Sequence, residues 1–369
     1  MRFMFFGILI GVIALFFFTL YGYFRAWKQV GLPKALFIAV ETVLTLVSLY
    51  TAFGFRTIPG EALRTVARFV SAVQFVFLVY SGLAMLIRNL VCLILKVFKK
   101  GDGFVKAVKS AGFYGAVAAI TVILGITGYI SMSAVTEKAY SIDVNKKSVN
   151  DSVTLAVTSD FHIGTGTSRR EVARAVDLIN AMDADAALIV GDLIDSNTPA
   201  DYLDMMVEEF SKVKTKYGFF FSFGNHDEMG TLNNVRDYLK KAGVRVLEDE
   251  AVTIADDVIL LGRLDYSQRG MEMSEFDLDR ERPVIVMNHQ PTRLSQIAQG
   301  GADVVLSGHT HGHQFPLVEL LVNPFNDNVY GLKYFDDMAS ITTCGVGAWG
   351  FHFKFPSRSE VVKLKINFK

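Results

Sequence analysis

Long runs of apolar residues dominate the first third of the chain. Four such runs, separated by short polar segments, cover residues 3–24, 35–55, 69–91 and 111–132. A helix needs about 20 residues to cross a hydrocarbon core of about 30 Å. The first run resembles a secretion signal in position, but it is long for one and lacks a clear small-residue cleavage site. The pattern therefore predicts four transmembrane helices, which form an anchor over residues 1–135.

From residue 152 the pattern changes to short apolar strands that alternate with amphipathic helices, after a polar linker over 136–151. A capping box, Ser168-Arg-Arg-Glu171, marks the start of the first helix. Alternating strands and helices favour a layered α/β domain over residues 152–369. Strands are predicted at 153–158, 186–190, 218–223, 244–247, 258–261, 284–287, 304–306, 340–343 and 361–366, and helices over 172–179, 200–214 and 232–242.

Composition agrees with this division of the chain. The hydrophobic content is 51% and the mean hydropathy is +0.33, which is too apolar for one soluble domain. Residues 1–136 hold 13 basic and 3 acidic residues, and the remainder holds 24 basic and 34 acidic residues. Eight basic residues lie in the first and third loops, against four at the N-terminus and in the second loop. The positive-inside rule then predicts that the C-terminal domain lies outside the cytoplasm.

Residues with metal-ligand chemistry gather just after predicted strands of the second half. Carboxylates, imidazoles and a carboxamide suit divalent transition ions, and no histidine precedes residue 162. In α/β sheets, ligands collect where loops from several strands converge. The sequence thus predicts a metal site built from five motifs: Asp160-Phe-His162, Gly191-Asp192, Gly224-Asn-His-Asp227, Asn288-His289 and Gly308-His-Thr-His311.

The order of these motifs resembles the signature of the calcineurin-like metallophosphoesterase superfamily, over roughly residues 150–369. Ser307–Gly312 and Gly345–Gly350 resemble its membrane-associated bacterial branch. The resemblance implies a metallophosphoesterase domain in the form of a two-sheet β-sandwich flanked by helices. It also implies two divalent metal ions, with Mn expected first and Fe, Zn or Co as alternatives.

The same resemblance assigns roles to residues by position. It implies that one ion is bound by Asp160, His162 and His311, the other by Asn225, His289 and His309, and that Asp192 bridges the two. A hydroxide held between the ions would attack phosphorus. His226 would protonate or stabilise the leaving oxygen, oriented by Asp227, and Asp195 would support the site without binding a metal.

The favoured hypothesis is a membrane-anchored phosphohydrolase that cleaves phosphomonoesters or phosphodiesters, possibly lipid-linked substrates of the cell envelope. The apolar segment 315–325 either packs on the domain or meets the bilayer or an acyl chain. Two alternatives remain. One is a nuclease or nucleotide phosphodiesterase of the same superfamily, of which a nuclease is disfavoured by the acidic second half, since acidic surfaces repel polyanions. A non-catalytic metal-binding sensor or interaction module is disfavoured by the intact set of ligands.

Four other residues carry weaker signals. Glu41 and Arg88, within predicted spans, are expected to be structural rather than part of a transport pathway. His313 departs from the superfamily pattern and either lines the phosphate pocket or is a tolerated loop substitution. His352 is expected to be a surface or loop residue. The two cysteines, Cys92 and Cys344, are not expected to form a disulfide.

Overall fold

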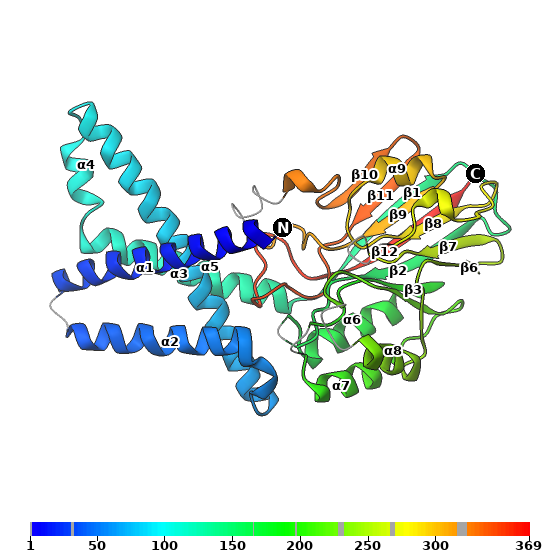
Figure 1. Cartoon of the computed structure of the whole chain (residues 1–369), viewed down its shortest axis with the longest axis horizontal. Helices are drawn as coiled ribbons and strands as arrows, with labels where there is room; N and C mark the ends of the chain where they lie inside the picture. The colour runs from blue at the N-terminus through cyan, green and yellow to red at the C-terminus, as the bar shows by residue number, and fades with distance from the viewer. Residues whose placement is uncertain are drawn as a thin grey trace. The chain divides into compact units, whose positions relative to one another are not determined.

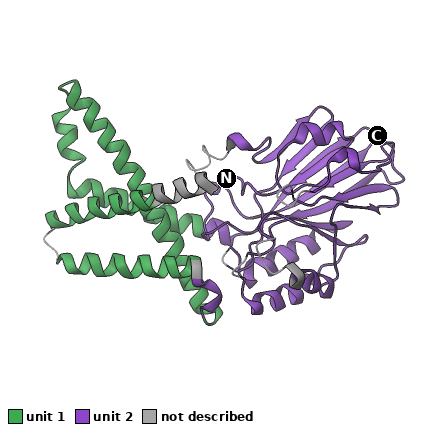
Figure 2. Ribbon diagram, in the orientation of Figure 1, with its two compact units in different colours: residues 1–53, 59–129 green, residues 54–58, 130–369 purple. Residues whose placement is uncertain are grey.

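The computed structural model describes residues 2–30, 33–164, 166–195, 198–227, 232–265, 270–315 and 323–369. The chain forms two compact units (Figure 2). Unit 1 comprises Met1–Phe53 and Pro59–Tyr129, and unit 2 comprises Gly54–Ile58 and Ile130–Lys369. Unit 1 is helical, with α1 (Arg2–Val30), α2 (Lys34–Gly54), α3 (Glu61–Val97), α4 (Asp102–Ala107) and most of α5 (Ala111–Ser133).

Three helices of the described residues are long and apolar enough to cross a membrane, over Lys34–Ala52, Glu61–Val97 and Ala111–Ser133. These correspond to three of the four predicted spans. The first predicted span lies in α1, where side chains up to residue 12 fall outside those described. Helix α3 extends well beyond the predicted 69–91 at both ends.

The ionisable residues of the predicted spans have partners within unit 1. Gln74 donates to Glu41 Oε2 over 2.8 Å, and Arg88 donates to the Tyr114 hydroxyl over 2.6 Å. Interhelical hydrogen bonds of this kind stabilise packing where no water is available. Their presence agrees with a structural role for both Glu41 and Arg88.

Unit 2 contains two mixed sheets of six strands each, in the orders β1-β12-β2-β3-β4-β5 and β10-β11-β9-β8-β7-β6. The strands of the first are β1 (Thr136–Val144), β2 (Ser152–Thr158), β3 (Ala186–Val190), β4 (Phe219–Ser222), β5 (Val244–Val246) and β12 (Glu360–Phe368). Those of the second are β6 (Glu250–Ile254), β7 (Val258–Gly262), β8 (Val284–Met287), β9 (Val304–Ser307), β10 (Gly331–Phe335) and β11 (Met338–Thr342). Strands β2, β3, β4 and β5 are parallel, as are β7, β8, β9 and β11.

The sheets pack face to face, and helices cover their outer faces. Alternate residues explain this arrangement, because Leu155 and Leu188 join the core between the sheets whereas Ala156 and Ile189 face the helices. Helices α6 (Arg169–Ala181), α7 (Ala200–Phe210) and α8 (Leu232–Lys241) cover the first sheet, and α9 (Leu294–Gln299) covers the second (Figure 1). The expected two-sheet sandwich flanked by helices is confirmed, as is the capping box of Ser168 and Glu171 at α6.

The predicted linker 136–151 is partly wrong, because β1 occupies Thr136–Val144. This strand pairs in parallel with the C-terminal strand β12 at the edge of the first sheet. Most of its residues are exposed, and its sequence lacks a continuous apolar face. An edge strand that takes its stability from backbone pairing with β12 leaves little hydrophobic pattern to detect.

Residues 54–58 are part of unit 2 although they follow α2. The Phe55 side chain is fully buried, and its ring centroid lies 6.3 Å from that of Tyr202. Phe55 also lies beside Gly164, in the loop that follows β2. The core of unit 2 therefore includes one side chain from the segment between α2 and α3.

Candidate metal centre

The predicted ligands follow the carboxyl ends of five strands. Asp160, Asp192, His289 and His309 each stand two residues beyond β2, β3, β8 and β9, and Asn225 follows β4 by three residues. These strands are parallel within each sheet, so their ends meet at one edge. The two packed sheets thus deliver five loops to one place.

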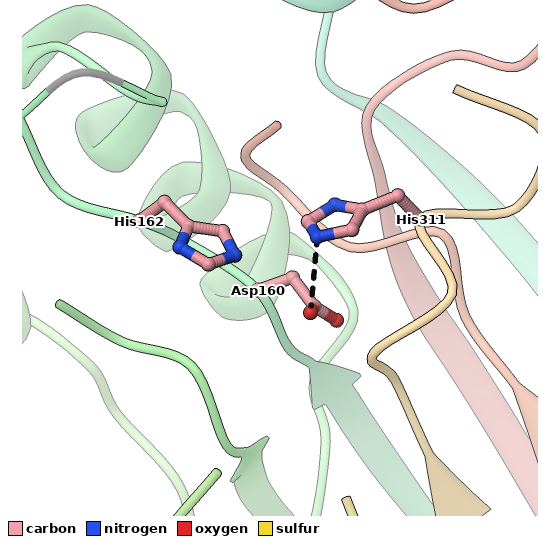
Figure 3. A group of neighbouring side chains, drawn as sticks. All are labelled: Asp160, His162 and His311. Atoms are coloured by element: carbon pink, nitrogen blue, oxygen red, sulfur yellow. Dashed lines mark ion pairs between the residues drawn. The ribbon is translucent and has the colours of Figure 1, made fainter. Parts of the chain in front are cut away.

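Asp160, His162 and His311 form the first group (Figure 3). One ligand atom from each lies within 4.8 Å of the others, and all three side chains are buried. His311 Nε2 is 3.6 Å from Asp160 Oδ1. The rings of His162 and His311 stack with centroids 5.1 Å apart. This is the set that the resemblance assigned to one ion.

Asp192, His289 and His309 form the second group. Asp192 Oδ2 is 3.0 Å from His289 Nε2 and 3.8 Å from His162 Nε2, which belongs to the first group. The carboxylate of Asp192 therefore lies between the two groups, in the place where a bridging ligand is needed. The buried carboxamide oxygen of Asn225, also expected at this ion, has no hydrogen-bond partner among the described residues.

Three ring nitrogens of the two groups share this property. His162 Nε2, His289 Nε2 and His311 Nδ1 are buried without an aligned hydrogen bond in the described part of the chain, although His289 Nε2 lies 3.0 Å from Asp192 Oδ2. Buried polar atoms are nearly always hydrogen-bonded, so several unpartnered atoms in one place require an explanation. Divalent metal ions provide one, because these atoms and the nearby carboxylates are the donors that such ions bind.

Hydrogen bonds on the opposite ring nitrogens fix the direction of two histidines. His289 Nδ1 donates to the carbonyl oxygen of Val190 over 2.8 Å, and His162 Nδ1 donates to Asp195 Oδ1 over 3.0 Å. Such contacts set the tautomer and leave Nε2 free to bind a metal. The sequence predicted a supporting role for Asp195, and this contact agrees with it.

The backbone of the ligand loops is strained. Five of the seven predicted ligands have φ between 44° and 69°, in the left-handed region that non-glycine residues seldom adopt, and these are Asp160, His162, Asp192, His309 and His311. A side chain on Gly224 would overlap Asp192, and one on Gly308 would overlap Asp160. Strain of this kind concentrates at functional sites, where the surrounding structure has to hold it.

Carboxylates determine the protonation of the rings. Burial alone would lower the pKa of His162, but nearby carboxylates, that of Asp195 first, raise it to about 9. Burial also opposes protonation of His289, yet Asp192 raises its pKa well above the usual value. The pKa of His309 is lowered to about 4, first by burial. A bound metal would displace protons from His162 and His289.

His226 lies beside the first group, and its ring centroid is 4.9 Å from that of His162. Its Nδ1 is 2.9 Å from Asp195 Oδ1, the oxygen that also accepts from His162. The expectation that Asp227 orients this ring is therefore wrong. The buried Asp227 carboxylate instead accepts hydrogen bonds from backbone N–H groups, at Asp192, Leu193, Ile194 and Gly224.

Two further residues support the site from the C-terminal loop. Lys354 is fully buried and donates to the carbonyl oxygens of Cys344 and Gly345. His352 lies in the same loop, which is one of its two expected placements, but it is buried rather than at the surface. Its Nε2 is 2.9 Å from Ser133 Oγ and its Nδ1 is 2.9 Å from the Gly166 carbonyl. A lysine among aromatic residues gave no signal in the sequence, since its carbonyl partners are set by the fold.

Comparison with known proteins identifies the family. The family model for calcineurin-like phosphoesterases matches residues 153–313. An uncharacterized metallophosphoesterase of Aquifex aeolicus is 31% identical over 202 residues, which cover 52% of this chain and 76% of that protein. A transmembrane protein with metallophosphoesterase domain from Danio rerio is 28% identical over 295 residues, which cover 73% of this chain and 66% of that protein.

An uncharacterized metallophosphoesterase of Campylobacter jejuni is 28% identical over 290 residues, which cover 76% of this chain and 76% of that protein. Among solved structures, a dimetal phosphatase from Danio rerio matches 53% of this chain and 88% of its own, at 11% identity and a TM-score of 0.34. The chain belongs to the calcineurin-like metallophosphoesterases, a family of metal-dependent phosphoesterases.

Proposed function

We propose that the protein is a membrane-anchored phosphohydrolase that uses two divalent metal ions to cleave phosphomonoesters or phosphodiesters. The observation that carries this proposal is the position of Asp192, whose Oδ2 lies 3.0 Å from a ring nitrogen of one ligand group and 3.8 Å from a ring nitrogen of the other. A shared carboxylate between two sets of buried, unpartnered donors is what a dinuclear site requires.

The seven predicted ligands would hold the two ions, with Mn as the first candidate metal. When bound, a pair of such ions lowers the pKa of a shared water and neutralises charge on the phosphoryl oxygens. His226 is placed to act on the leaving group, because its Nδ1 contacts Asp195 and its Nε2 remains available. Asp195 keeps the proton on Nδ1 of this ring, and Asp227 holds the backbone around Asp192 in place.

The membrane location rests on composition. Three described helices are apolar and long enough to span a bilayer, α1 would supply a fourth span, and relatives from Danio rerio and Bos taurus are named transmembrane proteins. With four spans and the observed loop charges, the catalytic unit lies outside the cytoplasm. Substrates of the envelope, including lipid-linked phosphoesters, then become the first class to test. The apolar segment 315–325, once a candidate for lipid contact, lies largely outside the described residues.

Metal analysis combined with turnover tests the proposal. The full-length protein, purified in detergent and loaded with Mn, is expected to bind two ions per chain and to hydrolyse 4-nitrophenyl phosphate or bis(4-nitrophenyl) phosphate. Chelation should abolish turnover, and adding Mn back should restore it. A polyprenyl phosphate in the same detergent tests the lipid-linked class. Two bound ions without hydrolysis of any phosphoester would instead support a non-catalytic metal-binding module.

A further inference from the structure

A cavity of about 530 Å³ adjoins the second ligand group. Asn288 and Gln290, the two residues that flank His289, both line it. The other walls come from the loop after β7, from the turn near Met273 and from α9. Cavities of this size hold small organic ligands. The cavity therefore lies where part of a substrate bound at the metals can reach.

Positive charge distinguishes this cavity from the rest of an acidic unit. Three arginines line it, Arg263, Arg280 and Arg293, together with the acidic residues Asp265 and Glu272. Arg293 forms an ion pair with Glu272 at 2.8 Å. The Asp265 carboxylate accepts two hydrogen bonds from Gln290, at 2.8 and 3.0 Å.

Arg263 and Arg280 form no ion pair with any described residue. Arg263 donates to Asn288 Oδ1 over 2.8 Å and to the Met271 carbonyl over 2.7 Å, while its buried Nε has no partner in the described structure. Arg280 is exposed and forms no hydrogen bond or ion pair within the described part of the chain, and its aliphatic stem lies against Gly301. The carboxylates of Asp249, Glu272 and Asp265 offset part of the cost of burying the Arg263 guanidinium, although none of them forms an ion pair with it. A bound anion would compensate this charge directly.

A purely structural role accounts for only part of this arrangement. Arg263 orients Asn288, which precedes a metal ligand, and two of its N–H groups suffice for that contact and for Met271. The unpartnered Nε and the unpaired Arg280 remain unexplained. Two guanidinium groups facing one cavity are the usual recognition elements for phosphate.

We propose that this cavity binds a second phosphate group of the substrate, so that the preferred substrates are phosphoesters with two phosphate groups. The proposal rests on the proposed hydrolytic function. One phosphate would be hydrolysed at the metals, while Arg263 and Arg280 hold the other.

Paired sugar phosphates test the proposal on the full-length Mn-loaded protein. The ratio of kcat/KM for fructose 1,6-bisphosphate to that for fructose 6-phosphate is expected to be roughly tenfold or more, as charge-assisted hydrogen bonds are strong enough for such a preference. Arg280→Gln and Arg263→Gln should each remove this preference. The ratio should then reflect only that the bisphosphate carries two phosphate groups that can be hydrolysed and the monophosphate carries one. Arg245→Gln, which removes an exposed arginine paired with Glu250, is the matched control and should keep the wild-type ratio.

The outcomes separate the two hypotheses. Hydrolysis of both sugar phosphates without preference, or a preference that survives Arg280→Gln, would overturn the second-phosphate site. Absence of hydrolysis with every phosphoester would instead overturn the proposed function. Added inorganic phosphate separates a free-anion site from a substrate subsite. If phosphate changes turnover of 4-nitrophenyl phosphate non-competitively in the wild type but not in Arg280→Gln, the cavity is a regulatory site and the substrate proposal fails.

Discussion

His162 and His226 share one carboxylate oxygen, Oδ1 of Asp195. This oxygen accepts from Nδ1 of both rings and thereby fixes their orientation, with Nε2 of each ring on the side away from Asp195. Both rings form, together with Asp195, a third group whose ligand atoms lie within 4.8 Å of one another, and His162 also belongs to the first group. Asp195 is partly buried, and both histidines lower its pKa although desolvation acts in the opposite direction, so it stays ionised at neutral pH. A single carboxylate oxygen therefore connects a predicted metal ligand, His162, to the proposed proton donor, His226.

His226→Ala should reduce turnover without reducing metal binding. The variant loses the proposed proton donor, so turnover of 4-nitrophenyl phosphate is expected to fall by roughly two to four orders of magnitude. Its content of Mn, measured by elemental analysis, should remain at the wild-type level because no predicted ligand is removed. Arg245→Gln, which changes an exposed residue of β5 outside the site, serves as the control. Wild-type turnover in His226→Ala would exclude a role for His226 in the reaction.

Metal uptake should depend on pH in a direction set by the raised pKa values. His162, with a pKa of about 9, is protonated at neutral pH, and His289 titrates well above its usual range. Metal binding requires the neutral rings, so protons are released and the apparent affinity rises by roughly tenfold per pH unit for each displaced proton. This increase should level off only above the pKa values of both His162 and His289. Titration calorimetry in buffers of different ionisation enthalpy measures the released protons, and affinity independent of pH would contradict the assignment.

At the scale of elements, parallel strand ends collect the ligands, and the C-terminal loop holds them from behind. Val346 N–H donates to the Ser159 carbonyl over 3.0 Å and Gly347 N–H donates to the Asp160 carbonyl over 2.7 Å. The buried Lys354 holds the same loop through the carbonyls of Cys344 and Gly345. The strained backbone at Asp160 is thus supported by a segment almost 200 residues away in the chain.

Lys354→Met should weaken this support. Methionine fills similar volume but leaves two buried carbonyl groups without their donor, at an expected cost of about 1–3 kcal/mol each. The melting temperature and the retained Mn should both decrease. Lys365→Met on β12 makes the same chemical change at an exposed position and should leave both unchanged. Equal melting temperatures for the two variants would show that Lys354 does not stabilise the loop.

Local patterns made much of this architecture predictable. The strands β3 and β8 have the predicted bounds, because they are short continuous apolar segments between polar ones. Strand β1 could not be predicted this way, since it is polar and depends on pairing with β12 more than 200 residues later. The contact between Asp195 and His226 could not be predicted for the same reason. The two residues lie in different loops, which come together only because β3 and β4 are paired in the sheet. Adjacency in sequence suggested Asp227 instead, and its carboxylate turned out to serve the backbone.

At the scale of the whole molecule, the buried segment 54–58 constrains topology. With unit 1 as the proposed membrane anchor, we expect this segment to lie on the same side of the membrane as the sheets of unit 2, because it folds with that unit. The chain between them must then cross the bilayer an even number of times. Crossings by α3 and α5 satisfy this condition whether or not α1 is a span.

Reporter fusions test this topology. An enzyme that is active only outside the cytoplasm should be active when fused after Ile58 or after Lys369, and inactive when fused after Gly101. A cytoplasmic reporter should give the reverse pattern. Opposite results for the fusions at Ile58 and Lys369 would contradict an even number of crossings. If the cytoplasmic reporter were active at both positions, the number of crossings would still be even, but unit 2 would lie in the cytoplasm.

The burial of Phe55 also determines where the protein can be cut. A fragment that starts at residue 130 would contain all seven predicted ligands but would lack one side chain of its own core. Loss of a buried phenylalanine side chain costs about 3–5 kcal/mol, a large part of the 5–15 kcal/mol that stabilises a typical domain. Such a fragment would expose Tyr202 and the loop of Gly164 to water. The segment between α2 and α3 thus supplies a piece of the fold that carries the predicted ligands, in addition to linking two helices of the proposed anchor.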